Sequence, residues 1–185
     1  INSYRPEYLY GYATALTALA HILEPHRDQL HVKLKAVVST SETLSPEQAA
    51  LFSRVFGCPA ANEYGARDAG ILGYSCPCGG LHITAENCIL ETLDPVTYEP
   101  VPAGQSGVLA ITDLTNHVQP RLRYLLGDVG TLSETPCSCG RTLPLLSSIE
   151  GREDALLVGK AGALVHGNLI GQLLRPLSFV RSFQF

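Results

Sequence analysis

The stretch HVKLKAVVSTSETLSPEQAALFSRVFG, residues 31–57, decides the fold class. Residues 32–38 alternate between apolar and polar side chains and then become wholly apolar, as a strand does when it enters a covered sheet. Residues 45–48 open a helix, with serine as N-cap, proline at the first helical position and glutamine closing a capping box. That helix runs to about Phe56, and Gly57 ends it. The first third of the chain is therefore predicted to be α/β.

The segments on either side of this stretch complete the predicted element order. Residues 8–23 carry leucines and a tyrosine at helical spacing and predict a helix. From residue 70 onward, short apolar runs separated by proline and glycine predict strands and turns. The expected strands are 70–74, 81–84, 88–93, 107–112, 121–125 and 129–132, then a strand pair near 156–158 and 163–165, and a helix near 168–174. The change in texture predicts a domain boundary at 150–154.

Composition narrows the function classes. The 185 residues include 13 Lys and Arg against 17 Asp and Glu, a net charge of −4 without basic clusters, which argues against a nucleic-acid partner. No apolar run reaches membrane-spanning length, and no secretion signal is visible, so we expect a cytoplasmic protein without membrane contact. The chain has no Met and begins at Ile1, and we expect it to be a piece of a longer protein.

Two cysteine couplets indicate a structural metal. Cys76-Pro77-Cys78 is followed by Gly-Gly-Leu and His82, and Cys137-Ser138-Cys139 is followed by Gly-Arg. Thiolates on tight, glycine-bearing turns, together with one imidazole, suit a tetrahedral Zn²⁺ site. Five side chains compete for four positions. We favour Cys76, His82, Cys137 and Cys139 as the metal ligands, with Cys78 in reserve.

Disulfides are the alternative interpretation of the couplets. Neighbouring cysteines in a CxC sequence cannot easily bridge each other, so a disulfide would have to join one couplet to the other, which would suit a secreted protein. Free thiols in loops, with no functional role, are a further alternative. Cys58 and Cys88 stand among apolar neighbours and are expected to be small core residues.

Three polar segments carry candidate chemistry. Residues 62–68, NEYGARD, place an aromatic ring beside a glycine and a carboxylate on the same turn, which suits a stacked ligand, a ribose or a cation. Residues 121–128, RLRYLLGD, end an expected strand with a carboxylate, where ligands commonly bind in open sheets. Residues 150–154, EGRED, are a plausible hinge. The alternatives are an ordinary loop, a type I turn and a solvated linker, respectively.

Taken in order, these segments resemble one family. The succession is Tyr-Gly-x-Arg-Asp, CxC with Gly-Gly-Leu-His, Thr-Asp-Leu-Thr-Asn at 112–116, Arg-Tyr-x-x-Gly-Asp, CxCGR and Glu-Gly-Arg-x-Asp. It is similar to the adenylate-forming enzymes, and within them to the phenylacetate-CoA ligase branch and the CapK-like proteins linked to capsular polysaccharide biosynthesis. The resemblance runs from about residue 8 to residue 185.

The resemblance implies a fold and a reaction. Residues 1–150 would be the second half of the large adenylation domain, an α/β sheet portion followed by a β-rich, barrel-like portion. Residues 151–185 would be the hinge and the start of a small α+β domain. A carboxylic acid would attack the α-phosphate of ATP with Mg²⁺, giving an acyl-adenylate and pyrophosphate, and a thiol, usually coenzyme A, would take the acyl group. A homodimer is an open alternative for the assembly.

The resemblance also implies residue roles in nucleotide binding. Tyr64 would stack on adenine, Gly65 would allow close approach, and Asp128 would bind the ribose hydroxyls. Three further residues match segments that line the nucleotide pocket: Ser41, Glu42 and Glu63.

The catalytic residues implied by the resemblance are Asp68, on the magnesium and phosphate side, and Arg152, which would reach the ribose or phosphate. Asp154 matches the hinge about which the small domain rotates. The cysteine couplets with His82 look like the zinc site that this branch has near its acyl pocket.

Several positions depart from the family pattern. Asp68 replaces a Glu, Leu125 an Arg, and Ala155 the second Asp of the hinge. Residues 1–185 contain neither the phosphate-binding loop nor the lysine of the small domain. We therefore expect the isolated chain to be inactive. The alternative is a degenerate relative that keeps a zinc-stabilised scaffold or binding role in polysaccharide biosynthesis.

Overall fold

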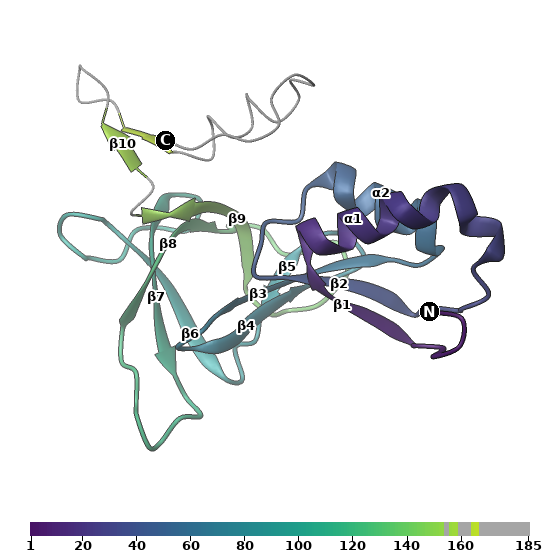
Figure 1. The fold of residues 1–185 in the computed structure, drawn as a ribbon. Helices are drawn as coiled ribbons and strands as arrows, with labels where there is room; N and C mark the ends of the chain where they lie inside the picture. Colours follow the sequence, from purple (N-terminus) through teal and green to yellow (C-terminus); the bar gives the residue numbers. More distant parts are fainter. Residues whose placement is uncertain (154–155, 159–163, 167–185) are drawn as a thin grey trace.

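The computed structural model describes residues 1–153, 156–158 and 164–166. Its main feature is a nine-stranded sheet with the strand order β1-β2-β3-β4-β5-β9-β8-β7-β6 (Figure 1). Two short strands, β10 (Leu156–Val158) and β11 (Leu164–His166), form a separate antiparallel pair. Asp154, Ala155 and the helix expected near residues 168–174 lie outside the described residues.

The first part of the sheet is parallel and carries the helices. Both helices lie on the same face of β1, β2 and β3 (Figure 1). Leu16, Val37 and Phe52 are central to the core between them. The elements are β1 (Tyr8–Tyr12), α1 (Ala13–Leu23), the 3-10 helix η1 (Glu24–Gln29), β2 (Ala36–Thr40), α2 (Pro46–Phe56) and β3 (Ala60–Ala66). Neither helix has the length and continuous apolar content that a bilayer-spanning helix needs, within the residues described.

The predicted helix at residues 46–56 is confirmed in detail. The Ser45 hydroxyl accepts a hydrogen bond from the Gln48 backbone N–H at 3.2 Å, and the Gln48 side chain accepts one from the Ser45 backbone N–H at 3.0 Å. Gly57 has a left-handed backbone, with φ of 69°, and its N–H bonds to the Ser53 carbonyl. The capping box and the C-terminal glycine therefore begin and end α2 at the residues that the sequence indicates.

The predicted helix over residues 8–23 is wrong in its first turn. Tyr8–Tyr12 is a strand that pairs in parallel with Ala36–Thr40, and the helix begins only at Ala13. The helical spacing at Leu9 and Tyr12 is coincidental, because non-local pairing determines the backbone there. The expected strand at 32–38 is shifted in the same way, since the ladder runs through the polar residues Ser39 and Thr40 instead.

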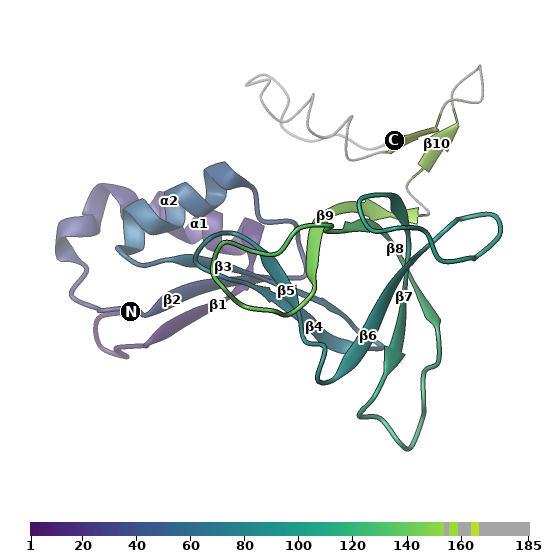
Figure 2. The ribbon, with the colours of Figure 1, turned by 180° about the vertical axis from the view of Figure 1, so that it is seen from behind.

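The second part of the sheet is antiparallel and curls away from the helices (Figures 1 and 2). Its strands enclose a second apolar core with Leu72, Leu109 and Ile111 fully buried. The elements are β4 (Gly70–Ser75), β5 (Leu81–Ile83), β6 (Cys88–Leu93), β7 (Ser106–Asp113), β8 (Tyr124–Leu132) and β9 (Leu145–Arg152). The predicted α/β class, with a β-rich second portion, is confirmed.

Several predictions in this portion need correction. The expected strands at 121–125 and 129–132 are one continuous strand, β8, and the expected turn at Gly127-Asp128 lies inside it. Residues 62–66, which could have been a loop, belong to β3. Residues 150–152, expected as a hinge or linker, end β9, a strand that the sequence did not indicate. The pair β10 and β11 lies as expected, with β11 starting one residue later. The domain boundary stays a prediction.

Candidate functional site

Two turns of the same design bring the cysteines together. In the turn between β4 and β5, the Gly79 N–H bonds to the Cys76 carbonyl at 2.8 Å, and in the loop between β8 and β9 the Gly140 N–H bonds to the Cys137 carbonyl at 3.2 Å. Both glycines have a positive φ, 86° and 79° respectively. A positive φ is easily reached only by glycine, so the CxCG spacing is the local cause of both turns. The loop that carries the second turn runs beside β5 (Figure 2).

The two turns and β5 assemble four potential metal ligands. The ligand atoms of Cys76, His82, Cys137 and Cys139 all lie within 4.8 Å of one another. The Cys76 and Cys137 Sγ atoms are 3.5 Å apart, and the Cys139 Sγ is 3.2 Å from the His82 Nε2. A tetrahedral zinc with ordinary bond lengths would separate two sulfurs by about 3.8 Å and a sulfur and a nitrogen by about 3.6 Å. The four side chains fit such an ion after small shifts.

The pKa of Cys76 and the exposure of Cys78 agree with the proposed group of four ligands, whereas the pKa of the Cys137 thiol is raised. Burial acts to raise the pKa of the Cys76 thiol, but hydrogen bonds with Cys137 and other polar neighbours outweigh it and lower the pKa to about 6. The thiolate is the form that binds metal. Cys78 is exposed and stands outside the group of four. All six cysteines are free thiols, so the disulfide alternative is not realised.

A second group of side chains surrounds Asp128. The Tyr64 hydroxyl donates to its Oδ2 at 2.8 Å, and the Arg152 Nη1 lies 3.3 Å from its Oδ1. The same Arg152 nitrogen donates to the Leu126 carbonyl at 2.8 Å. The Asp128 side chain is 13% exposed, against 57% for Arg152. A largely buried carboxylate is thus held by a phenol from β3 and a guanidinium from β9.

The β8–β9 ladder explains why this group forms. Asp128 and Arg152 are direct cross-strand partners, so their side chains leave the same face of the sheet. Gly127 makes room for the guanidinium: a Cβ at this position would lie 2.8 Å from the Arg152 Nη2. Gly127 also has a φ of 72°, which favours glycine. Within β8, Gly127 therefore leaves space for the Arg152 side chain, and Asp128 pairs with that side chain.

Tyr64 is deeply buried in this group. Only 7% of the residue is exposed, and its ring belongs to the second apolar core. Burial, together with the nearby Asp128 carboxylate, raises the pKa of the Tyr64 phenol, which therefore stays protonated as a hydrogen-bond donor. The predicted stacking of this ring on adenine stays a prediction.

Asp68 has a tyrosine partner of its own. It lies in the turn between β3 and β4, and the Tyr124 hydroxyl at the start of β8 donates to its Oδ2 at 3.0 Å. The hydrogen bond to Asp68 raises the pKa of the Tyr124 phenol. The Arg121 guanidinium lies 5.8 Å from the centre of the Tyr124 ring, within range of a cation–π contact.

The remaining predicted nucleotide residues make other contacts. Glu42 accepts two hydrogen bonds from Thr14, at 2.7 Å from its N–H and 2.9 Å from its hydroxyl, and so caps the first turn of α1. Ser41, which precedes it, has a φ of 63°, an uncommon backbone conformation for a non-glycine residue. Glu42 thus joins the end of β2 to α1, and the role of Ser41 and Glu42 towards a nucleotide stays a prediction.

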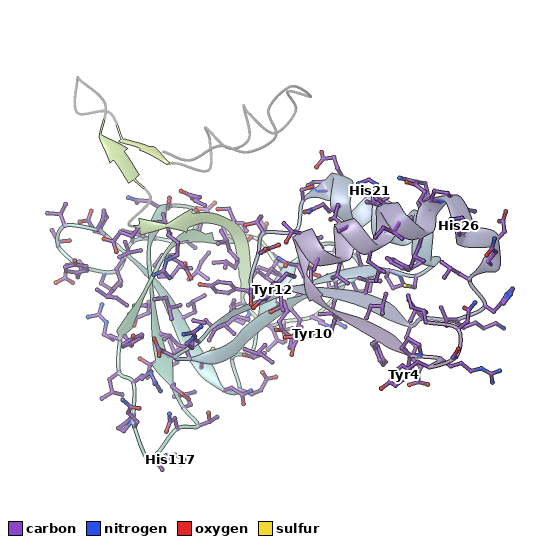
Figure 3. The ribbon with its side chains drawn as sticks, viewed as in Figure 1. Tyr4, Tyr10, Tyr12, His21, His26 and His117 are labelled. Carbon is purple, nitrogen blue, oxygen red and sulfur yellow. The ribbon has the colours of Figure 1, made fainter. Side chains whose placement is uncertain are left out.

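Glu63 points away from Tyr64. Successive side chains of a strand alternate between the faces of the sheet, and the Glu63 carboxylate accepts hydrogen bonds from Tyr10 at 2.6 Å and Thr40 at 2.8 Å. Tyr10 belongs to a row of exposed tyrosines along β1, two of which are labelled in Figure 3. The structure therefore separates Glu63 from the group around Asp128.

Gly65 is required by the backbone of the neighbouring strand. A Cβ there would lie 2.7 Å from the Gly70 carbonyl oxygen, at the irregularity where β3 pairs with β4.

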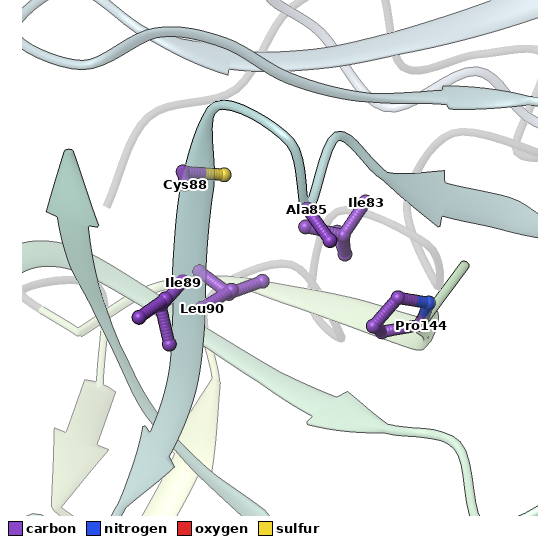
Figure 4. A pocket seen from close by; sticks show the side chains of 6 residues that line it. All are labelled: Ile83, Ala85, Cys88, Ile89, Leu90 and Pro144. Carbon is purple, nitrogen blue, oxygen red and sulfur yellow. The ribbon is translucent and has the colours of Figure 1, made fainter. Parts of the chain in front are cut away.

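An apolar hollow of about 140 Å³ lies beside the first residues of β6 (Figure 4). It is smaller than the roughly 300–1,000 Å³ of ordinary ligand sites. None of the predicted site residues lines it; its lining residues are Ile83, Ala85, Cys88, Ile89, Leu90 and Pro144.

Tyr124 lies in the Arg-Tyr-x-x-Gly-Asp motif, but the sequence alone assigned it no role. A signal for it exists, because Tyr64-x-x-x-Asp68 and Tyr124-x-x-x-Asp128 repeat one spacing in two segments. Each tyrosine bonds to the aspartate of the other segment. The repeated spacing could have suggested that the two segments are partners.

Comparisons with known proteins find coenzyme A ligases and Protein CapK among the proteins similar to this chain. A phenylacetate-coenzyme A ligase of Thermus thermophilus is 39% identical over 106 residues, which are 55% of this chain and 24% of the relative. Protein CapK of Staphylococcus aureus is 24% identical over 168 residues, 89% of this chain and 35% of the relative. A 2-hydroxyisobutyryl-CoA ligase, solved in an open conformation with 2-HIB-AMP and CoA, matches 96% of this chain with a TM-score of 0.78 and 22% identity. No protein-family model matches the chain.

The resemblance to the phenylacetate-CoA ligase and CapK-like branch of the adenylate-forming enzymes is confirmed. The structural match shows that the chain has the fold of part of an adenylate-forming large domain. The chain spans 24% and 35% of the length of the two curated relatives and 43% of the solved ligase. It thus corresponds to a minor part of each of these proteins.

Proposed function

We propose that this chain is the second half of the nucleotide-binding domain of an AMP-forming acid–thiol ligase that resembles phenylacetate-CoA ligase. The parent protein would convert a carboxylic acid and ATP into an acyl-adenylate and pyrophosphate, and then transfer the acyl group to the thiol of coenzyme A with release of AMP. The observation that carries this proposal is the hydrogen-bonded group of Tyr64, Asp128 and Arg152, in a chain with this fold.

Asp128 would bind the ribose. A carboxylate offers about four lone-pair directions, and the hydrogen bonds from Tyr64 and Arg152 use one on each oxygen of Asp128. The carboxylate thus keeps capacity to accept hydrogen bonds from a vicinal diol. The Tyr64 phenol and the Arg152 guanidinium would fix its orientation before the nucleotide arrives, which lowers the entropic cost of binding.

Asp68 and Arg152 would act closer to the phosphates. The carboxylate of Asp68 is exposed on the β3–β4 turn and can ligate Mg²⁺, a cation that prefers oxygen ligands. Arg152 carries a permanent positive charge, which would stabilise a phosphate oxygen or a ribose hydroxyl beside Asp128. Bound Mg²⁺ would supply neutralisation of the phosphate charge. Asp154, outside the described residues, would serve as the hinge.

The group of Cys76, His82, Cys137 and Cys139 would hold a structural Zn²⁺. Three thiols and an imidazole with these separations match the ligand types of structural zinc sites. The ion would tie the β4–β5 turn to the β8–β9 loop, and so would brace the strands that carry the nucleotide residues. Reduced thiols of this kind suit a cytoplasmic protein.

A second candidate function follows from the match to CapK and from the departures at Asp68, Leu125 and Ala155. The parent protein would then be a degenerate relative that keeps the zinc-braced fold as a scaffold or binding module in polysaccharide biosynthesis.

Acid-dependent ATP–pyrophosphate exchange by the full-length parent protein tests the two candidates. The ligase should exchange pyrophosphate with phenylacetate or another aryl acid, and Asp128→Ala should raise the KM for ATP more than it lowers kcat, because ribose contacts change little on reaching the transition state. The isolated chain should show no exchange. A parent that binds zinc and folds but exchanges with none of a panel of carboxylic acids would favour the scaffold.

A further inference from the structure

Two reciprocal hydrogen bonds join β3 and its following turn to β8. Tyr64 donates to Asp128 at 2.8 Å, and Tyr124 donates to Asp68 at 3.0 Å. Within each segment the tyrosine precedes its aspartate by four residues. The donor lies in β3 in one bond and in β8 in the other. The two segments are therefore held together at two points, and each segment supplies one donor and one acceptor.

These bonds are not made between neighbouring strands. In the sheet, β3 and β8 are separated by β4, β5 and β9, so the side chains meet across the curled part of the sheet. The contact between Tyr64 and Asp128 is the buried end, and the contact between Tyr124 and Asp68 is the exposed end. The exposed end is the one that can be removed without opening a core.

The geometry at the exposed end constrains one oxygen of Asp68. A phenol has a single proton to donate, and it is given to Oδ2. The cation–π contact with Arg121 further restricts the Tyr124 ring. An exposed aspartate on a turn would otherwise sample several rotamers, and ordering it on ligand binding would cost free energy. A held Asp68 leaves Oδ1 for a ligand.

We propose that Tyr124 is a positioning residue for Asp68. It orients the Asp68 carboxylate for a divalent cation bound to the phosphates of ATP, and so sets the distance between the cation site on the β3–β4 turn and the ribose site on β8. The inference rests on the proposed function, because it needs Asp68 as the ligand on the magnesium side. It adds a residue that acts through Asp68 without contacting substrate.

The test uses the full-length parent protein with Tyr124→Phe, Asp68→Asn and the double variant. Tyr98→Phe is the matched control, because it removes a hydroxyl from another exposed tyrosine. Tyr124→Phe should raise the Mg²⁺ concentration for half-maximal pyrophosphate exchange about fivefold, the equivalent of about 1 kcal/mol, one net hydrogen bond. The rate at saturating Mg²⁺ should stay near that of the wild type. Tyr98→Phe should change neither.

The double variant separates positioning from a structural role. If Tyr124 acts through Asp68, adding Tyr124→Phe to Asp68→Asn should have little further effect on the Mg²⁺ requirement. Two results would overturn the inference. One is that Tyr124→Phe lowers the rate equally at every Mg²⁺ concentration, and the other is that Tyr124→Phe raises the Mg²⁺ requirement as much in the Asp68→Asn background as in the wild type.

A direct binding measurement keeps this inference distinct from the proposed reaction. Mn²⁺ can be titrated with ATP and the parent protein by electron paramagnetic resonance, without any turnover. Weaker Mn²⁺ binding by Tyr124→Phe than by the wild type supports the positioning role, whether or not any acid supports exchange. Absence of exchange with every acid would contradict only the proposed reaction. Equal Mn²⁺ binding by both proteins would overturn the inference while exchange by the wild type still supports the reaction. Failure of the parent to bind Mn²⁺ with ATP would overturn both.

Discussion

Replacing Cys139, a ligand of the proposed zinc site, should lower the Tm far more than replacing Cys78, which lies outside that site. Cys139 and Cys78 both occupy the third position of a CxCG turn, yet only Cys139 belongs to the group of four, 3.2 Å from the His82 Nε2. Cys139→Ala therefore removes one of four ligands, whereas Cys78→Ala removes an exposed thiol from an otherwise equal turn. The pair is a matched test of which thiols bind the metal.

The expected magnitude follows from linkage between metal binding and folding. Zinc at a thousandfold excess over its dissociation constant stabilises the folded state by about 4 kcal/mol. In a protein of 150–250 residues each kcal/mol shifts Tm by about 2–4 °C. Cys139→Ala should therefore lower Tm by about 8–16 °C. Cys78→Ala should shift it by about 2 °C or less, as exposed substitutions do.

Elemental analysis and thermal denaturation of the purified, reduced chain provide the assay. We expect about one zinc per chain in the wild type and in Cys78→Ala, in line with a four-ligand structural site, and close to none in Cys139→Ala. A chelator should lower the Tm of the first two proteins to that of the third. Metal-free wild-type protein that folds with the same Tm, or zinc lost from Cys78→Ala and kept by Cys139→Ala, would refute the assignment.

Three further substitutions test the structure in the isolated chain. Glu42→Ala removes the cap on the first turn of α1 and should lower the free energy of unfolding by about 1 kcal/mol in urea titrations, while an unchanged midpoint would contradict the cap. Tyr64→Phe removes a hydrogen bond to the Asp128 carboxylate and should cost about 1.5–3 kcal/mol near pH 7. Because the folded pKa of this phenol is raised above its ordinary value of 10.0, its stabilising contribution is complete below pH 10 and is lost as the pH rises further, so wild type and variant should converge in alkaline solution. Gly80→Ala places a methyl group 2.9 Å from the Cys137 Sγ and should cost about 1–3 kcal/mol, with reduced zinc content.

The features that the sequence predicted well are those set by local chemistry. Serine, proline and glutamine at residues 45–48 and Gly57 fix the two ends of α2 by themselves, because caps satisfy backbone groups within one turn. The structure also brings together the four predicted metal ligands, since each couplet forms its own glycine-bearing turn, while metal binding itself stays a prediction. The sequence does not indicate why Cys78 is left out, because that depends on where β5 places His82.

The features that the sequence did not predict depend on non-local pairing. Tyr8–Tyr12 has a helical spacing of apolar residues, but five consecutive pairs with β2 make it a strand. Leu145–Arg152 mixes serine, glycine and charge, and becomes β9 because β5 and β8 provide partners on both sides. Local propensity is a weak guide where two neighbouring strands supply the hydrogen bonds.

The position of Asp128 illustrates why the candidate site was harder to predict than the fold. Gly-Asp is a turn signal in isolation, and a turn would direct the carboxylate to solvent. Inside β8, the same residue faces Arg152 across the ladder and Tyr64 across the curled sheet, 24 and 64 residues away in the sequence. The surrounding strands therefore convert a local turn signal into a largely buried, oriented carboxylate. Since a ligand site needs groups held in place before the ligand arrives, contacts of this long sequence separation are the ones that would make the two Tyr-x-x-x-Asp segments a site, and local sequence patterns do not indicate them.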